Sequence, residues 1–169
     1  SILFHWDGVS WRQAMRLCHG WISDVAIQGK NRVWFAMGGR GQVLLWDGTG
    51  FSWQPILGYD SPSGTGSDVN QFAVGSDGTL WGAGYFGGIA RLDGGTWRSY
   101  RVDSADDEGA YLGQIKGGDR NGFWSLTGDQ LWHVDAAGIR QPVLKLSGTM
   151  NDMDVVSDAS GVPEVIMIG

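Results

Sequence analysis

The chain has 169 residues, the length of one domain that can bury a core, and it combines 29 Gly and 10 Trp with a single Cys. Its net charge of −6 with scattered Arg excludes a nucleic-acid-binding surface, which needs a basic stripe. The sequence contains no run of 18 apolar residues, so it predicts no membrane span. Because Cys18 is the single cysteine, an internal disulfide is excluded.

The chain begins with the segment LFHWDGVSW (3–11), after which short β-strands are predicted. The first set lies at 24–28, 33–37, 42–46 and 51–56, and the second set lies at 69–74, 79–84, 89–92 and 97–102. Apolar and β-branched runs of four to six residues, separated by Gly and Asp-Gly, are typical of β-hairpins. Each set therefore predicts one unit of four strands.

The Asp of the opening segment marks an internal repeat. It recurs as Asp7, Asp47, Asp93 and Asp135, at spacings of 40, 46 and 42 residues. A second motif, VWFAMG (33–38), returns as LWGAG (80–84) and FWSLTG (123–128), and VIMIG (165–169) has the same shape. A period of about 40 residues predicts a repeat architecture. The first three Asp are interpreted as formers of two-residue type I′ turns rather than as catalysts or ligands, because Asp-Gly supplies the positive φ that such turns require.

Most tryptophans fall into aligned columns. Trp34, Trp81 and Trp124 align with Ile166, and Trp11, Trp53 and Trp97 align with Ile139. A column that accepts Trp and aliphatic residues alike indicates packing rather than ligand binding. Because sheets stacked face to face around an axis bury both faces, most of these side chains are predicted to fill the core between sheets.

Two groups of repeat proteins resemble this pattern over essentially the whole chain. SDGTLWGAG followed by GGIARLDGGTW is similar to the propeller repeats in the sensor regions of two-component regulators. VIMIG read into SILFHWDGVSW is similar to secreted or lipid-anchored repeat proteins of Gram-negative bacteria. The fourth repeat departs from both, since it lacks the Gly after Asp135 and the final Trp. The resemblance implies a β-propeller and leaves the function open, because propellers bind sugars, peptides, metals and proteins.

The predicted fold is all-β, a β-propeller of four-stranded blades in one domain (1–169). Reading the last repeat into the first gives a spacing of 41 residues, within the range seen inside the chain. This predicts four blades with one blade shared between the two terminal segments, which removes two exposed sheet edges. The alternative is an excerpt of a longer propeller. The predicted boundaries are 1–15 for the outer half of the shared blade, 16–57, 58–103 and 104–146 for full blades, and 147–169 for the inner half.

The sequence shows no catalytic constellation. His5 and His133 share a column with Leu45 and Arg91, which is typical of a strand position at a sheet surface. The motifs of zinc proteases and serine hydrolases are also missing from the sequence. We therefore expect a protein that is not an enzyme and needs no cofactor.

Polar residues recur at one position of the innermost predicted strands. Asp24, Gln71 and Gln114 each stand ten residues before the Trp column, and Asp154 joins them if the last turn is two residues longer. Inner strands line the central channel of a propeller, so these side chains are predicted to form a ring around its axis. One interpretation is a water-filled channel. The other is a bound cation such as Ca²⁺, which prefers carboxylate and amide oxygens.

One loop face carries bulky or charged residues at turns that otherwise need only Gly. These residues are Arg40, Tyr85, Phe86, Tyr111 and Asp129. Aromatic and Arg side chains are enriched at protein interfaces. The sequence therefore predicts that this face contacts a protein partner.

The function predicted from the sequence is binding or assembly, as a rigid module or accessory subunit that contacts another protein. A carbohydrate-binding lectin is the first alternative, because the WDGxGW pattern is similar to that of fucose-binding propeller lectins and Arg12, Arg98 and Arg140 follow the last-strand column. The second alternative is a ligand-sensing domain of a larger receptor. The resemblance to secreted proteins implies export to the periplasm or the cell exterior, with lipid anchoring through an absent N-terminal segment as a further expectation.

Overall fold

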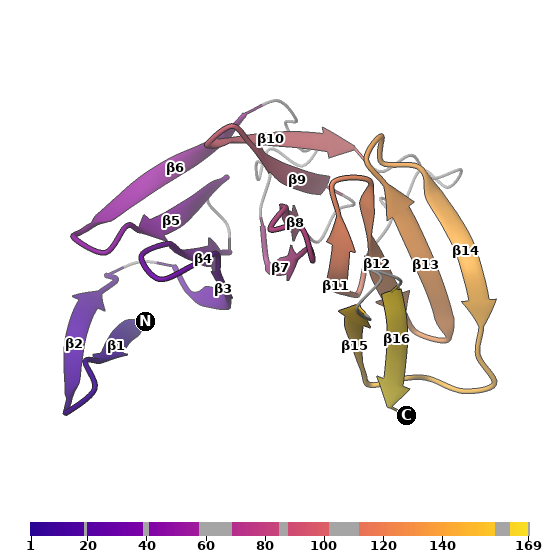
Figure 1. The fold of residues 1–169 in the computed structure, drawn as a ribbon, viewed down its shortest axis with the longest axis horizontal. Helices are drawn as coiled ribbons and strands as arrows, with labels where there is room; N and C mark the ends of the chain where they lie inside the picture. The colour runs from indigo at the N-terminus through magenta and orange to yellow at the C-terminus, as the bar shows by residue number, and fades with distance from the viewer. Residues whose placement is uncertain are drawn as a thin grey trace.

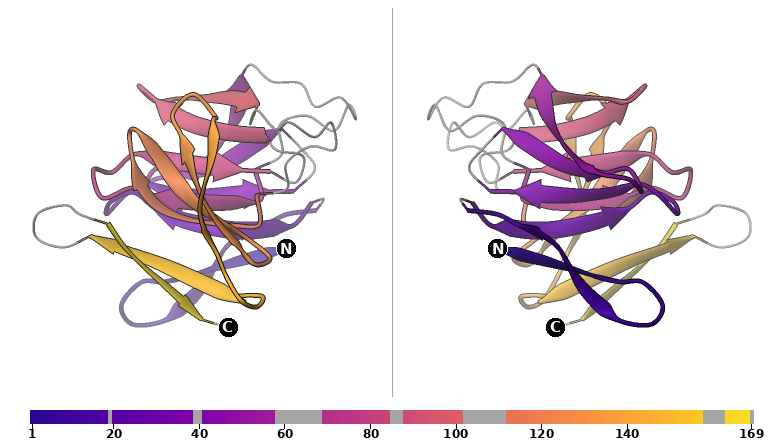
Figure 2. Two further views of the ribbon diagram at one scale, coloured as in Figure 1. Left: turned by 90° about the vertical axis from the view of Figure 1, so that its right-hand side faces the viewer. Right: turned by 90° about the vertical axis from the view of Figure 1, so that its left-hand side faces the viewer.

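The computed structural model describes residues 1–18, 20–38, 41–57, 69–84, 88–101, 112–157 and 163–168. This part of the chain holds sixteen β-strands and no helix, which confirms the predicted all-β class. None of its elements is a helix long and apolar enough to cross a membrane. Figure 1 shows the strands arranged as an arc of sheets, and Figure 2 shows the same arc from its two ends, where successive sheets stack one behind another.

The first two repeats form one eight-stranded sheet made of two four-stranded meanders. Its order is β3-β4-β5-β6-β10-β9-β8-β7, so the outermost strands β6 and β10 join the two meanders. This junction is a short parallel pairing in which Trp97 lies opposite Ile56 and Arg98 lies opposite Leu57. The strands are β3 (Ile22–Ile27), β4 (Val33–Met37), β5 (Gln42–Trp46), β6 (Phe51–Leu57), β7 (Gln71–Val74), β8 (Leu80–Ala83), β9 (Gly88–Asp93) and β10 (Thr96–Arg101).

The third repeat forms a separate four-stranded antiparallel meander in the order β11-β12-β13-β14. Its register places Trp124 opposite His133 and Leu126 opposite Gln114. The strands are β11 (Gln114–Asp119), β12 (Gly122–Thr127), β13 (Gln130–Asp135) and β14 (Arg140–Lys145).

The two ends of the arc are hairpins that belong to different sheets. The first hairpin pairs β1 (Ile2–Trp6) with β2 (Trp11–Arg16), and the last pairs β15 (Asp152–Ser157) with β16 (Pro163–Ile168). Figure 1 shows them at opposite ends of an open arc. The shared blade expected from the repeat spacing is therefore not formed among the described strands of this structure. Each hairpin instead packs on the core of the sheet beside it in the chain.

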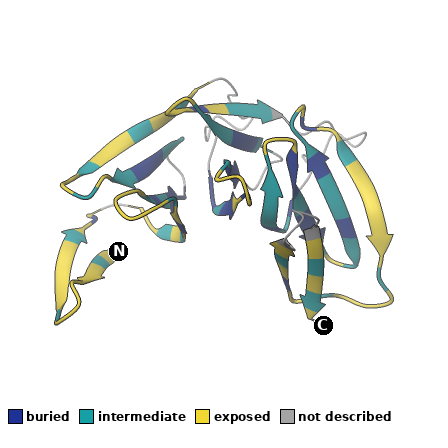
Figure 3. Ribbon diagram, in the orientation of Figure 1, coloured by how far each residue is buried: buried dark blue, intermediate teal, exposed yellow. Residues whose placement is uncertain are grey.

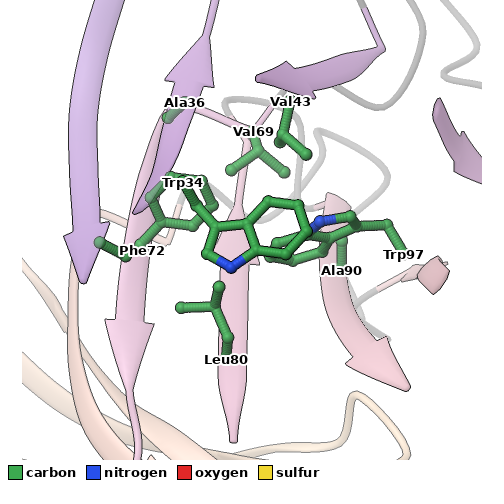
Figure 4. Close-up of a cluster of buried hydrophobic side chains, with 9 residues drawn as sticks. Trp34, Ala36, Val43, Val69, Phe72, Leu80, Ala90 and Trp97 are labelled. Carbon is green, nitrogen blue, oxygen red and sulfur yellow. The ribbon is translucent and has the colours of Figure 1, made fainter. Parts of the chain in front are cut away.

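Buried tryptophans hold the first two meanders together. Trp34 of β4 and Trp97 of β10 meet edge to face with ring centroids 5.4 Å apart, and Figure 4 shows both rings among small and branched apolar side chains. Trp97 is 1% exposed, whereas Trp11, in the same repeat column, is 67% exposed. Figure 3 shows this trend, with buried residues in the middle of the arc and exposed ones on the hairpin of β1 and β2. A residue at this repeat position is thus buried where a neighbouring meander covers it.

The Asp-Gly segments are turns, and the one after Asp93 has the positive φ at both central residues that the predicted type requires, 56° at Gly94 and 90° at Gly95, whereas the turns at Asp7 and Asp47 do not. The Asp47 carboxylate accepts the backbone N–H groups of Thr49 and Gly50 at 2.8 and 2.9 Å, and Asp7 makes the equivalent bonds. Gly48 has a φ of 94°, but no described residue other than Gly has a positive φ. A type I′ turn needs positive φ at both central residues. These Asp residues therefore stabilise the turns through their side chains, as in Asx-turns, rather than through a left-handed backbone.

Candidate binding face at the inner strands

The predicted polar column lies at the same end of each inner strand. Asp24, Gln71 and Gln114 stand at or near the starts of β3, β7 and β11. Their partners lie near the ends of the neighbouring strands: Asp24 is opposite Ala36 of β4, and Gln71 is opposite Ala83 of β8. One face of the arc therefore contains the starts of the inner strands and the ends of β4, β8 and β12.

These polar side chains link the inner strand of each repeat to the inner strand of the next one by hydrogen bonds. Each accepts a backbone N–H from the following inner strand, a contact that we call the latch. The donors and acceptors are Phe72 N to Asp24 Oδ2 at 2.7 Å, Ile115 N to Gln71 Oε1 at 3.1 Å, and Met153 N to Gln114 Oε1 at 3.2 Å. The two glutamines also donate through Nε2 to the backbone oxygens of Gly113 and Asn151. The column thus acts first as a connection between sheets.

The fourth position of the column is occupied by Asp152 rather than Asp154. In the β15–β16 register Asp152 lies opposite Ile168, and Asp154 lies opposite Ile166. Since Ile166 aligns with Trp34, Ile168 aligns with Ala36, the partner of Asp24. The connection between β15 and β16 is four residues longer than the corresponding turns of the other repeats, whereas the prediction allowed for two. The residue equivalent to Asp24 is therefore Asp152, two positions before Asp154. Asp154 instead lines the deeper part of the channel described below.

Two connected cavities follow the inner strands. The outer cavity has a volume of about 350 Å³ and is lined by polar residues that include Ser23, Asp24, Asn70, Gln71, Gln114 and Lys116. The deeper cavity, of about 250 Å³, is lined by Asp24, Phe72, Lys116, Gly117, Asp154 and Val155. Asp24, Phe72 and Lys116 border both cavities. The inner strands thus border a polar space, and a closed central channel stays a prediction.

Asn70 is the unusual residue of the outer cavity wall. Its backbone N–H donates to the Ala83 oxygen at 2.8 Å, but the residue is 5% exposed and neither Oδ1 nor Nδ2 has a hydrogen-bond partner among the residues that the structure describes. Leaving buried polar atoms unpaired costs about 1–3 kcal/mol. Lys116 likewise has no ion-pair partner among the described residues. Among the described residues, the wall of the outer cavity therefore carries an amide without a hydrogen-bond partner and an ammonium group without an ion-pair partner.

The cation interpretation of the channel remains a prediction. Both carboxylate oxygens of Asp24 already accept backbone N–H groups, from Val25 at 2.8 Å and from Phe72 at 2.7 Å. Across the described ranges no three His, Cys, Asp or Glu side chains gather as a metal site. Lys116 also places a positive charge at the same space. A cation at Asp24 would share carboxylate oxygens that already accept hydrogen bonds and would bind beside that ammonium group.

Most of the predicted partner-contact residues fall outside the part of the chain that the structure describes. These are Arg40, Tyr85, Phe86 and Tyr111. Asp129 is described and lies in the turn between β12 and β13, on the face where β12 ends. Its carboxylate is 3.9 Å from Lys145 Nζ, and both side chains are exposed. The contact role of all five residues stays a prediction.

The Arg column that suggested a lectin does not form a repeated site. Arg12 pairs with Asp7 at 2.8 Å on the exposed first hairpin. Arg140 instead stacks 3.7 Å above the ring of Trp132, whose Nε1 is buried without a partner. Desolvation by burial lowers the pKa of Arg140 below its usual value. Arg140 thus covers the aromatic face that a sugar would need.

The two histidines of the repeat column act as packing residues. His5 lies 5.6 Å from the Trp46 ring, and His133 lies 5.1 Å from the Trp124 ring. They belong to different sheets and form no common site. Reasoning from the sequence missed Asn70 and Lys116, although a polar residue inside VNQFAV and a Lys inside QIKGG were visible signals.

Comparison with solved structures identifies the fold. Virginiamycin B lyase from Staphylococcus aureus, solved with quinupristin, is 14% identical with a TM-score of 0.63, over 91% of this chain and 51% of that one. YCF48 bound to D1 peptide is 17% identical with a TM-score of 0.60, over 96% and 54%. The extracellular domain of the putative one component system BT4673 from B. thetaiotaomicron is 18% identical with a TM-score of 0.52, over 89% and 23%. These are propeller-like repeat proteins, so the fold is that of β-propellers.

The chain spans about half to three fifths of the first solved structures that it matches. No protein-family model matches the sequence, and no curated protein does either. One expectation needs correction. The similar structures include virginiamycin B lyase, streptogramin B lyase and a gluconolactonase from Xanthomonas campestris, so the exclusion of an enzyme does not hold. A search for known motifs fails here because propellers host unrelated chemistries at different positions of one fold.

Proposed function

We propose that the protein is a binding module of the β-propeller type, which receives a segment of another protein at the polar cavity of its inner strands. In this proposal the three meanders are blades with the boundaries predicted from the sequence, 16–57, 58–103 and 104–146. The observation that carries the proposal is Asn70, whose buried amide keeps both a donor and an acceptor unpaired beside the cavity.

The chemistry of this amide matches a peptide group. A side-chain amide offers one acceptor oxygen and an NH₂ donor, and a peptide bond offers the complementary N–H and C=O. Lys116 supplies a positive charge that would pair with an acidic side chain or a terminal carboxylate. YCF48, of similar fold, was solved with a bound peptide, which supports this kind of ligand.

The predicted loop face and the cavity belong to one surface in this proposal. Asp24, Gln71 and Gln114 mark the cavity at the starts of the inner strands, and the ends of β4 and β8 lie beside them. Contacts from Arg40, Tyr85, Phe86, Tyr111 and Asp129 would surround a segment held at the centre. We place the module outside the cytoplasm, as an accessory subunit or sensor region, in keeping with the extracellular domain of similar fold.

Capture of a partner from the native source tests the proposal. The tagged protein is compared with Asn70→Leu and Lys116→Ala, and Lys30→Ala, exposed in the turn between β3 and β4 and not part of the cavity lining, serves as the matched control. We expect both cavity variants to lose a captured protein that wild type and Lys30→Ala retain. Equal capture by all four proteins would reject the cavity as the binding site. A glycan array run in parallel detects a lectin, and specific glycan binding in place of protein capture would replace the proposal.

A further inference from the structure

The latch at Asp24 differs from the other two in what its side chain can donate. Gln71 and Gln114 each accept a backbone N–H of the next inner strand through Oε1 and donate Nε2 to the carbonyl two residues earlier in that strand. Asp24 accepts the Phe72 N–H in the same way, so the equivalent carbonyl is that of Asn70. A carboxylate has no N–H to donate. The Asn70 oxygen therefore lacks the side-chain donor that its two equivalents have.

Asp24 and Asn70, which we call the junction, line one cavity and offer several acceptors to it. The Asp24 carboxylate accepts one N–H at each oxygen, which occupies about two of its roughly four lone-pair sites. Among the described residues it forms no ion pair. Asn70 Oδ1 is buried without a partner. A negative charge beside unpaired amide and backbone oxygens favours a cationic N–H donor.

The positive charge of the same cavity does not fill this role. Lys116 lines the outer cavity with Asp24, yet the described residues contain no ion pair between them. Both residues lie on inner strands of complete four-stranded meanders, Asp24 on β3 and Lys116 on β11. The cavity of about 350 Å³ is therefore bordered by one negative and one positive group that do not neutralise each other. A ligand with both charges would complement both groups.

We propose that the segment received at the outer cavity carries a basic residue next to its acidic group. Its Lys or Arg side chain binds the junction and donates to the Asp24 carboxylate and the Asn70 oxygens. Its carboxylate binds Lys116 and accepts from Asn70 Nδ2, so the two ends of one buried amide serve opposite charges. This inference rests on the proposed function, whose site it shares, and adds the charge pattern of the partner.

An array of short synthetic peptides tests this charge pattern. The peptides have blocked ends and random sequences of Ala, Ser, Gln, Lys and Glu, so every charge belongs to a side chain. We expect the peptides that bind the wild-type protein to contain both Lys and Glu. Replacing either residue of a bound peptide by Gln should raise its Kd about tenfold or more, because each replacement removes a charge-assisted hydrogen bond. Fluorescence anisotropy of labelled peptides measures these Kd values.

The repeat supplies a matched variant for the junction. Asp24→Gln installs the side chain that the other two latches use, so it retains an acceptor for Phe72, adds a donor for the Asn70 oxygen and removes the negative charge. It should melt no lower than wild type and should bind a peptide equally well with Lys or with Gln at the basic position. Asp24→Asn, which keeps the size of Asp, should lose the preference for Lys as well. Lys30→Ala, exposed and outside the cavity lining, should keep it.

The outcomes separate this inference from the function on which it rests. If the bound peptides contain no Lys, or if Asp24→Gln prefers Lys as wild type does, the inference is wrong; loss of the same peptides by Asn70→Leu would still support the cavity as the binding site. Equal binding by Asn70→Leu and wild type, or an array without any bound peptide, would overturn both. Displacement of a bound peptide by Ca²⁺, reversed by chelator, would assign the junction to a metal ion and also overturn the inference.

Discussion

Replacement of Asn70 by Leu should stabilise the free protein while abolishing partner binding. Asn70 is 5% exposed, and both polar atoms of its side chain are buried without a partner among the described residues. Leu has the same branched shape and number of side-chain heavy atoms and removes the polar atoms, so the free energy of unfolding should rise by about 1–3 kcal/mol. For a domain of this size, 1 kcal/mol corresponds to roughly 2–4 °C in melting temperature. Such gains in stability at the expense of binding are expected at functional sites.

Gln71→Leu, at the next residue, provides the opposite control. This change removes the hydrogen bonds to Gly113 and Ile115 and leaves their backbone groups unpaired, so it should destabilise by about 1–3 kcal/mol. Urea unfolding followed by tryptophan fluorescence, without a partner, measures both variants. If Asn70→Leu loses stability as Gln71→Leu does, the Asn70 amide is satisfied in the free protein, and the reasoning that assigns it to a ligand is refuted.

Three further predictions concern the core, a turn and the channel. Trp97→Ala should lower the free energy of unfolding by about 3–5 kcal/mol, whereas Trp11→Ala in dilute solution should lower it by less than about 1 kcal/mol. Similar losses in the two variants would contradict the difference in burial between Trp97 and Trp11. The Thr49 hydroxyl and the backbone N–H groups of Gly50 and Thr49 lower the pKa of Asp47 from 3.8 to about 2, so its stabilisation is present above pH 4 and is lost as the pH falls toward 2. Asp47→Asn should flatten the melting temperature over that window, and an unchanged slope would exclude this contribution. Chelator should leave the melting temperature unchanged because Asp24 is engaged in a latch; a decrease that Ca²⁺ reverses, and that Asp24→Asn removes, would establish the cation.

The repeat pattern predicts the local structure well because its information is local. The strands of the first two repeats lie within a few residues of their predicted bounds, since alternating apolar residues and Gly-rich turns determine them directly. The column positions of Trp34 and Trp97 correctly indicate packing, which here joins the two meanders of the eight-stranded sheet. The Asp-Gly segments are correctly turns, and the predicted type agrees with the backbone at Gly94 and Gly95; at Asp7 and Asp47 the type depends on side-chain hydrogen bonds that a two-residue pattern does not specify.

Features that depend on geometry between sheets were less predictable. The sequence spacing allows the terminal halves to complete one sheet, but the angle between successive sheets arises from packing and is not visible in a repeat length. The sequence favours Asp154 over Asp152 for the polar column because composition shows that a turn is present but does not show how long it is. Asn70 was missed because an unpaired amide is a property of its surroundings in three dimensions. The non-enzyme expectation rested on missing motifs, which propellers do not require.

The parallel pairing of β6 with β10 has a consequence for how the molecule opens. This pairing merges the first two meanders into one hydrogen-bonded sheet around the Trp34 and Trp97 core, so they separate only if that pairing and that core are both broken. The third meander is a separate sheet, joined to the second by a buried cluster around Trp81 and Phe123 and by hydrogen bonds such as Trp81 Nε1 to the Asp119 oxygen. Amide hydrogen exchange should therefore be slow across β3–β14 and fastest in the two terminal hairpins.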